Sequence, residues 1–132
     1  ANAGYLERKL LNAVADKPKL KVIVLDLEAV DQIDATGEEM LTHMSERLAE
    51  AGIEFYISRA KFKVTDALKR SGLYDVIGEQ HFFAKRIRAL NAIKEKYGDE
   101  VDVSHLIYHK PVEEEPDDAN EVSASKSNND KD

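Results

Sequence analysis

The chain has 132 residues, of which 42% are hydrophobic and 34% are charged, and its formal net charge at pH 7 is −7. These values are typical of one globular domain with a modest hydrophobic core. The absence of cysteine excludes disulfides, thiol catalysis and cysteine-ligated metal sites. No apolar run approaches the roughly 20 residues that a membrane-spanning helix needs.

The negative charge is concentrated at the C-terminus. Residues 111–132 contain eight acidic residues and two lysines, so this tail carries −6 and leaves −1 for residues 1–110. The nearly neutral body lacks the basic surface that nucleic acids attract, so no nucleic-acid partner is expected. The tail is rich in Glu, Asp, Ser and Asn without aromatic residues, which predicts an acidic disordered segment over 111–132.

The first half of the chain predicts two helices and two strands. Leucines at helical spacing indicate a helix over Gly4–Ala15, which Pro18 ends. A run of mostly β-branched residues predicts a buried strand over Lys21–Leu27. An amphipathic helix follows over Ala35–Ala51, and a second strand over Ile53–Ser58. Two strands joined through a helix are expected to be parallel neighbours with a right-handed crossover.

The second half predicts two more helices and a short strand. The helices are expected over Phe62–Arg70 and Ala84–Tyr97, with a short edge-like strand at His81–Phe83 between them. Val101–His109 alternates weakly between apolar and polar residues, which fits a strand or a docking segment. In the last helix we expect an inward stripe of Ile87, Leu90 and Ile93. Its basic residues are interpreted as a solvated face: Lys85, Arg86, Arg88, Lys94 and Lys96.

These elements together predict an α/β sandwich. Its best candidate site is the corner where the first strand passes through an acidic turn into the helix that opens on Asp34-Ala35-Thr36-Gly37. A helix N-terminus presents unpaired N–H groups and the positive end of a dipole. Two capping registers compete, one with Asp34 as N-cap and one with Thr36 as N-cap and Glu39 at N3. The plainest interpretation of these residues is that they only start a helix.

A family resemblance rests on this corner and on two other segments. Leu25-Asp-Leu-Glu-Ala-Val-Asp-Gln-Ile-Asp-Ala-Thr-Gly37 resembles the signature of STAS domains, which occur in sulfate transporters and anti-sigma factor antagonists. The opening Ala1-Asn2-Ala3 and the segment Asp66-Ala-Leu-Lys-Arg-Ser-Gly-Leu73 extend the resemblance, which runs from residue 1 to about 97. The Asn2 opening and the Ala35-Thr36 pair are more similar to the branch attached to SulP transporters.

The resemblance implies a fold and a domain organisation. The expected fold is a STAS-like sandwich, similar to the anti-sigma factor antagonists, with a mixed, mainly parallel sheet and four helices. STAS domains begin with a strand or hairpin ahead of the first helix, and this piece is expected to be missing from the chain. We therefore expect a STAS domain truncated at its N-terminus over 1–97, an extension of uncertain structure over 98–110, and the tail.

The resemblance also suggests roles for particular residues. In free-standing antagonists the hydroxyl residue before the glycine is phosphorylated by a partner kinase, and the matching residue is Thr36. A phosphate there would add about −1.5 to −2 charges beside acidic neighbours. The same corner is a candidate surface for binding a protein, or alternatively an anion or nucleotide, although no cofactor is expected. Its residues are Asn2, Asp34, Ala35, Thr36, Gly37 and Glu38.

Catalysis and metal binding find no support in the sequence. No serine lies in a Gly-x-Ser-x-Gly context and no Ser/His/Asp arrangement can be argued. We interpret Asp26, Asp31 and Asp34 as turn and cap residues. His105 and His109 lie four apart in a strand-like stretch without a third ligand, so no metal site is expected.

The expected function is that of a regulatory and interaction domain of a SulP-type transporter for sulfate, bicarbonate or dicarboxylate. The resemblance places it at the cytoplasmic face of the inner (plasma) membrane. The expected partners are the membrane-spanning part of the same transporter, a cytoplasmic protein or a second copy of the domain. The alternatives are a free-standing anti-sigma factor antagonist switched at Thr36 and a small nucleotide-dependent enzyme.

Overall fold

The computed structural model describes residues 3–108. Asn2, His109 and the tail over 111–132 lie outside the described residues, so the expectations for them stay predictions. The first residues of the described chain form α1 (Ala3–Asp16), which leads through a short turn into the sheet.

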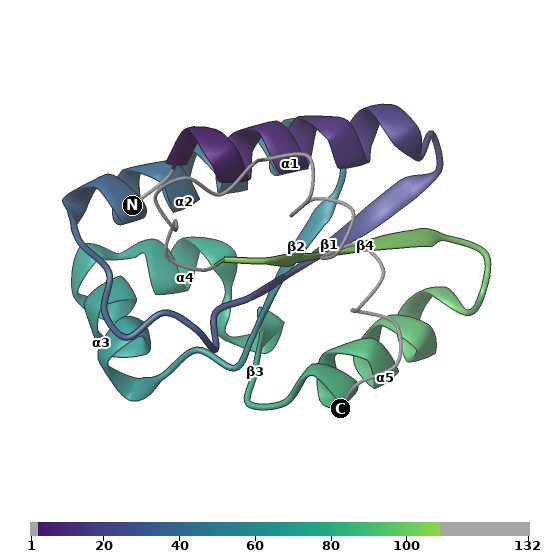
Figure 1. Ribbon diagram of the computed structural model, residues 1–132. Coiled ribbons are helices and arrows are strands. Elements are labelled where there is room, and N and C mark those ends of the chain that lie inside the picture. Colours follow the sequence, from purple (N-terminus) through teal and green to yellow (C-terminus); the bar gives the residue numbers. More distant parts are fainter. Residues whose placement is uncertain (1–2, 109–132) are drawn as a thin grey trace.

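The sheet is the centre of the fold, and every strand pairing in it is parallel. Its four strands lie in the order β3-β2-β1-β4. Their bounds are Leu20–Asp26 for β1, Glu54–Ser58 for β2, Phe82–Phe83 for β3 and Asp102–Ile107 for β4. Because parallel neighbours must be joined by crossovers, the helices lie on the faces of the sheet (Figure 1).

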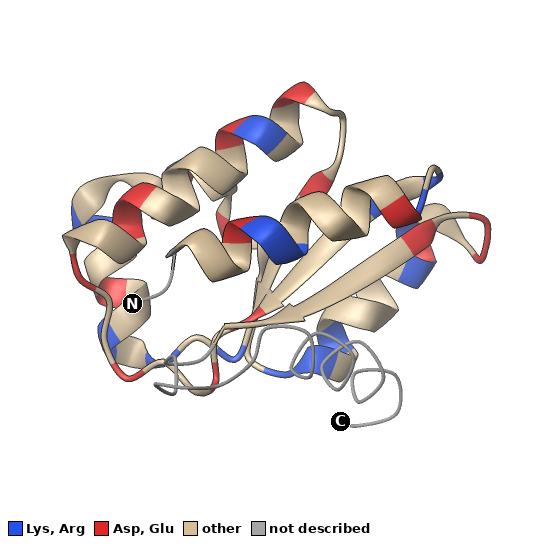
Figure 2. Cartoon of the chain, turned by 45° about the horizontal axis from the view of Figure 1, so that its top comes forward, with Lys and Arg blue, Asp and Glu red and all other residues tan. Residues whose placement is uncertain are grey.

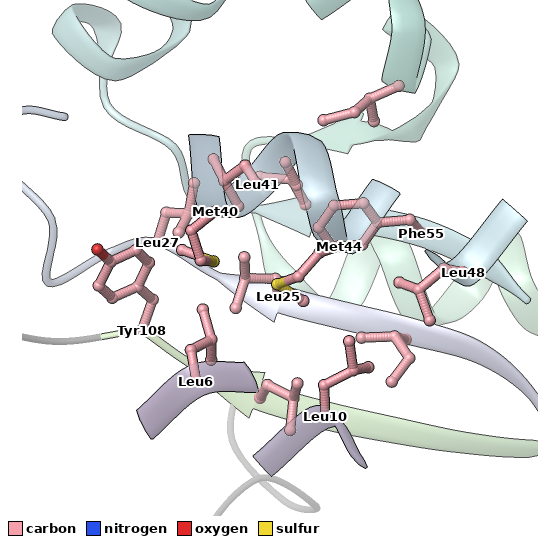
Figure 3. Packing of buried hydrophobic residues seen from close by; sticks show 14 of the residues in the cluster. Leu6, Leu10, Leu25, Leu27, Met40, Leu41, Met44, Leu48, Phe55 and Tyr108 are labelled. Carbon is pink, nitrogen blue, oxygen red and sulfur yellow. The ribbon is translucent and has the colours of Figure 1, made fainter. Parts of the chain in front are cut away.

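The helices divide unequally between the two faces. The larger core is formed where α1, α2 (Ala35–Glu50), α3 (Phe62–Ser71) and α4 (Leu73–Ile77) pack on Ile23, Leu25 and Ile57 (Figure 3). The smaller core contains Val22 and Val24 on the other face of β1, covered by α5 (Arg86–Tyr97). The two sets alternate along β1, so the central strand is buried on both sides.

The structure confirms the α/β sandwich and the predicted order of strands and helices, but adds a helix. We predicted four helices, and the described residues form five, because Leu73–Ile77 is also helical. This helix spans only five residues and directly follows Gly72, which adopts a left-handed φ of 87°. A segment of that length is too short to show a helical period in sequence.

The stretch Val101–His109, which we expected to be a strand or a docking segment, contains β4. This strand pairs with β1 on the side opposite β2, with Leu25 aligned to Leu106. The folded unit therefore continues past residue 97. The predicted boundary of the STAS domain at residue 97 stays a prediction. The expected strand or hairpin ahead of the first helix also stays a prediction.

The predicted inward face of the last helix is partly wrong. Ile87 is 38% exposed, whereas Arg86, which we placed on the solvated face, is only 5% exposed. The helix covers β1 and β2 mainly with Ala89 and Ile93, because its buried side is rotated toward Arg86. Arg86 tolerates burial because a buried carboxylate lies beside it, as described below.

A polar network joins β2 to the segments that follow it. Glu54 accepts hydrogen bonds from the hydroxyl of Tyr97 at 2.6 Å, from Nε2 of His81 at 2.9 Å and from Nζ of Lys96 at 2.9 Å. His81 ends the short 3-10 helix η1 (Glu79–His81). Burial alone would raise the pKa of Glu54, but these hydrogen bonds lower it from 4.5 to about 2. The network therefore fastens α5 and η1 to the sheet.

The lowered pKa predicts an acid-dependent loss of stability. A carboxyl group with a lowered folded pKa stabilises the fold above its unfolded pKa, and this contribution is lost as the pH falls from 4.5 toward 2. We expect Glu54→Gln to lower the free energy of unfolding by about 2 kcal/mol at neutral pH, because charge-assisted hydrogen bonds are lost. Urea unfolding at several pH values should show this difference shrinking below pH 4.5.

Glu100→Gln is the matched control for Glu54→Gln, because Glu100 is exposed. It should leave both the stability and its pH dependence unchanged. An acid transition in Glu54→Gln that matches that of the unsubstituted chain would contradict the assignment.

Candidate functional site

The corner between β1 and α2 contains the capped N-terminus of α2. Asp34 is the N-cap of α2, with an extended backbone, and its Oδ1 accepts a hydrogen bond from the N–H of Gly37 at 2.9 Å. The N–H of Glu38 donates to the carbonyl of Asp34, also at 2.9 Å. The register with Thr36 as N-cap is therefore wrong, because Thr36 is the second residue of the helix. The negative charge of Asp34 already lies at the positive end of the helix dipole and interacts favourably with it.

Gly37 has a packing role in this corner. It is buried, and a Cβ added to it would lie 2.7 Å from Cγ1 of Ile33 and 3.5 Å from Oδ1 of Asp34. The helix can begin close to the preceding turn only because position 37 has no side chain. Of the predicted surface residues, Gly37 is therefore not available for contact with a partner.

The other predicted residues of the corner lie at the surface. Asp34, Ala35 and Thr36 are exposed, and Glu38 is half-buried. Thr36 is the second residue of α2 and is exposed in the first turn of that helix. The structure thus brings four of the six predicted site residues together as one surface, with Gly37 beneath it.

Two hollows flank the beginning of α2. The smaller, between α1 and α2, has a volume of about 110 Å³ and is lined by Glu7, Leu10, Thr36, Glu39, Met40, His43, Met44 and Arg47. The larger is an open groove of about 580 Å³ between α2 and the α3–α4 junction. It is lined by Ala35, Thr36, Glu38, Glu39, Thr42, Glu46, Ser71, Gly72, Leu73 and Val76. Thr36 and Glu39 border both hollows.

The larger groove is electrostatically one-sided. Among residues 3–108, its lining includes the carboxylates of Glu38, Glu39 and Glu46 but no Lys, Arg or His. Such a groove repels phosphate, sulfate and other anions and attracts a basic polypeptide segment.

A buried ion cluster, which the sequence analysis missed, lies at the carboxyl end of the central strand. Asp26 is 3% exposed, and its Oδ2 accepts a hydrogen bond from Nε of Arg59 at 2.8 Å and from the hydroxyl of Ser58 at 3.3 Å. Nε of the buried Arg86 lies 3.8 Å from the same oxygen. We interpreted Asp26 as a turn residue, and its Oδ1 does accept a hydrogen bond from the N–H of Glu28 at 2.9 Å, whereas the role of Oδ2 in this cluster was not predicted. The available signal was a carboxylate at the end of an otherwise apolar strand, which requires a cationic partner when buried.

Tyr108 joins this edge of the sheet to the corner. Its backbone N–H donates to the carbonyl of Asp26 at 3.0 Å, and its side chain packs in the main core near Met40 (Figure 3). Burial raises the pKa of Tyr108, and the charge of Asp34 raises it further. The residue after β4 therefore lies within electrostatic range of the N-cap of α2.

No group of three or more potential metal ligands occurs within residues 3–108. None of the helices described in that range is long and apolar enough to cross a membrane.

Comparison with known proteins identifies the family. The model of the family described as STAS domain matches residues 1–89 of this chain. The chain belongs to the STAS domain family. The match extends from α1 to the first residues of α5 and includes the corner at Asp34, so β4 lies beyond it.

The similar proteins are sulfate transporters. A probable sulfate transporter of Mycobacterium tuberculosis is 30% identical over 97 residues, which are 73% of this chain and 17% of that protein. "Probable sulfate transporter 3.5" of Arabidopsis thaliana is 28% identical over 95 residues, or 71% of this chain and 15% of that protein. This STAS domain thus spans less than a fifth of the length of either relative.

Two solved structures share the fold. A sulfate transporter family protein from Wolinella succinogenes has a TM-score of 0.61 and 29% identity, over 70% of this chain and 75% of that one. The SulP transporter STAS domain from Vibrio cholerae has a TM-score of 0.61 and 28% identity, with 73% of each chain covered.

The capping geometry of the STAS domain predicts the effect of removing the Asp34 side chain. Asp34→Ala leaves the N–H of Gly37 without its acceptor, so we expect a loss of about 1 kcal/mol in the free energy of unfolding. Chemical denaturation followed by circular dichroism measures it. Asp31→Ala removes an exposed carboxylate that pairs with Lys61 across the surface, and its effect should be well under half as large. Equal losses in the two variants would refute a capping role.

Proposed function

We propose that this STAS domain is the regulatory and interaction domain of a SulP-type anion transporter at the cytoplasmic face of the inner (plasma) membrane. The observation that carries the proposal is its similarity to segments of sulfate transporters, at 28% and 30% identity over 95 and 97 residues. The anion is expected to be sulfate, or bicarbonate or a dicarboxylate of the same class. The domain itself would bind other polypeptides rather than catalyse a reaction.

The proposed contact surface is the acidic groove beside α2. It combines the exposed Thr36 with three carboxylates, and none of its lining residues in the described part of the chain is cationic. A basic segment from the membrane-spanning part, or from a cytoplasmic partner or a second copy, would have complementary charge. Contacts of this kind depend on ionic strength, because exposed charges are screened by salt.

Anion or nucleotide binding at the same corner is the less favoured alternative. Asp34 occupies the N–H of Gly37, and Glu38 adds negative charge at the end of α2, where a phosphate would bind. A bound anion would have to displace the carboxylate of Asp34 and approach those of Glu38 and Glu39. Calorimetric titration with sulfate and with GTP tests this alternative.

Phosphorylation of Thr36 remains a second candidate function, favoured by its exposure at the second position of α2. A phosphate would lie close to Asp34, Glu38 and Glu39, where it would increase the negative charge further. The modification would then strengthen the attraction of a basic partner or expel an acidic one. Phosphopeptide mass spectrometry from native cells tests this candidate, and a consistently unmodified Thr36 would exclude it.

The first test of the transporter assignment is the location of the native protein. An antibody raised against this domain should detect a protein several times longer than the chain, in the membrane fraction, resistant to extraction at high pH. A free-standing antagonist would instead be a small protein in the soluble fraction. That second result would overturn the proposal directly.

A charge reversal tests the contact surface in the native full-length protein. Glu39→Lys with Glu46→Lys replaces attraction by repulsion along the groove, at exposed positions that should not disturb the core. If each of the two contacts contributes about 1 kcal/mol, uptake of labelled sulfate should fall roughly thirtyfold at equal surface expression. The matched control is Glu79→Lys with Glu95→Lys, which changes the net charge equally outside the groove. Unchanged uptake in the first variant would refute this surface.

A further inference from the structure

The segment that forms α5 carries unbalanced positive charge. The segment 85–97 contains five basic residues and one acidic residue, Glu95. Two of the basic residues are neutralised by the fold, because Arg86 lies beside Asp26 and Lys96 donates to Glu54. The remaining three, Lys85, Arg88 and Lys94, are exposed and form no ion pair within residues 3–108. Figure 2 shows basic residues at the start of this helix and again near its end.

Two of these cations, Lys85 and Arg88, lie at an unfavourable position on the helix. The N-cap of α5 is Lys85, which forms no side-chain capping bond, and the first turn contains no acidic residue. Lys85 and Arg88 therefore lie at the positive end of the helix dipole, where cations destabilise a helix and anions stabilise it. The beginning of α2 is arranged oppositely, with Asp34 and Glu38. An acidic segment from elsewhere would correct the imbalance at α5.

The end of β4 brings such a segment close to α5. The N–H of Tyr108 donates to the carbonyl of Asp26 at 3.0 Å, and Nε of Arg86 lies 3.8 Å from Oδ2 of the same aspartate. The C-terminal end of the described chain and the beginning of α5 therefore converge on one residue. Only Arg86 of the helix takes part in that contact, so the exposed cations remain accessible.

The tail has the charge and the reach to cover this surface. Five acids occur among the six residues of the run 113–118: Glu113, Glu114, Glu115, Asp117 and Asp118. The run begins five residues beyond Tyr108, and five extended residues span about 17 Å. The twelve residues of α5 extend over about 18 Å. The run can therefore reach along most of the helix without strain.

We propose that the acidic run 113–118 binds the exposed cations of the α5 segment, Lys85, Arg88 and Lys94, of the same chain. The tether keeps the run at an effective concentration in the millimolar range, which allows binding through charge alone. Such a contact needs no hydrophobic core of its own, in agreement with the predicted disorder of the tail. While bound, the tail would prevent other polyanions from binding these three cations. This inference does not depend on the transporter assignment.

The absence of cysteine makes the contact directly measurable in the full chain. Asn120→Cys creates a single attachment point for a nitroxide spin label two residues beyond the acidic run. In isotope-labelled protein at about 0.05 M salt, amide signals of residues 85–94 should lose at least half of their intensity. The loss should disappear at about 0.5 M salt, because screening shortens the range of the attraction. Amide signals of the acidic α2 should not be affected.

Two variants with equal net charge test the specificity of the contact. Lys85→Glu, Arg88→Glu and Lys94→Glu together should abolish the signal loss on α5. Lys19→Glu, Lys21→Glu and Lys63→Glu, which change exposed lysines on other elements, should retain it. Loss of the effect in both variants, or in neither, would overturn the proposal.

A mixing experiment tests whether the contact forms within one chain or between two copies. Spin-labelled protein without isotope and isotope-labelled protein without spin label should together give no signal loss on α5, because the proposed contact lies within one chain. A loss in the mixture as large as that in the doubly labelled chain would assign the contact to a second copy and overturn the proposal. Signal loss spread evenly over the described surface would also overturn it.

Discussion

The carboxylate of Asp26 connects the central strand to the end of β2 and to the start of α5. It ends the central strand and accepts hydrogen bonds from Ser58 and Arg59 at the end of the neighbouring strand. It also faces Arg86 at the start of α5, and the backbone of the same residue pairs with Tyr108. A buried carboxylate without these cations would carry a large desolvation penalty, so its partners must be in place in the folded state. The cluster thereby determines where the last helix and the last strand lie.

The local part of the fold could be predicted from the sequence. The β-branched run of β1, the amphipathic period of α2 and the turn at Asp34 are each encoded by residues that are close in the chain. The parallel arrangement of β1 and β2 followed from the helix between them. The family resemblance to STAS domains rested on these same residues, and the family match confirms it.

The remaining features depend on partners that are distant in sequence. Arg86 appears to be an ordinary surface cation until Asp26, sixty residues earlier, is placed beneath it. The strand β4 alternates only weakly, and its place in the sheet depends on pairing with β1. The helix α4 is too short to show a period. The choice of Asp34 over Thr36 as N-cap was decided by one hydrogen bond, which sequence rules leave open within a few residues.

The glycine of the corner determines how variants at this site can be interpreted. Position 37 lies under the surface, with Ile33 close enough to occupy the space of a Cβ. Any larger residue there would displace Ile33, because an added Cβ would lie only 2.7 Å from its Cγ1. A partner that ceased to bind a Gly37 variant would therefore report a rearranged platform. Direct contact with the glycine could not be concluded from such a result, although the residue belongs to the signature stretch.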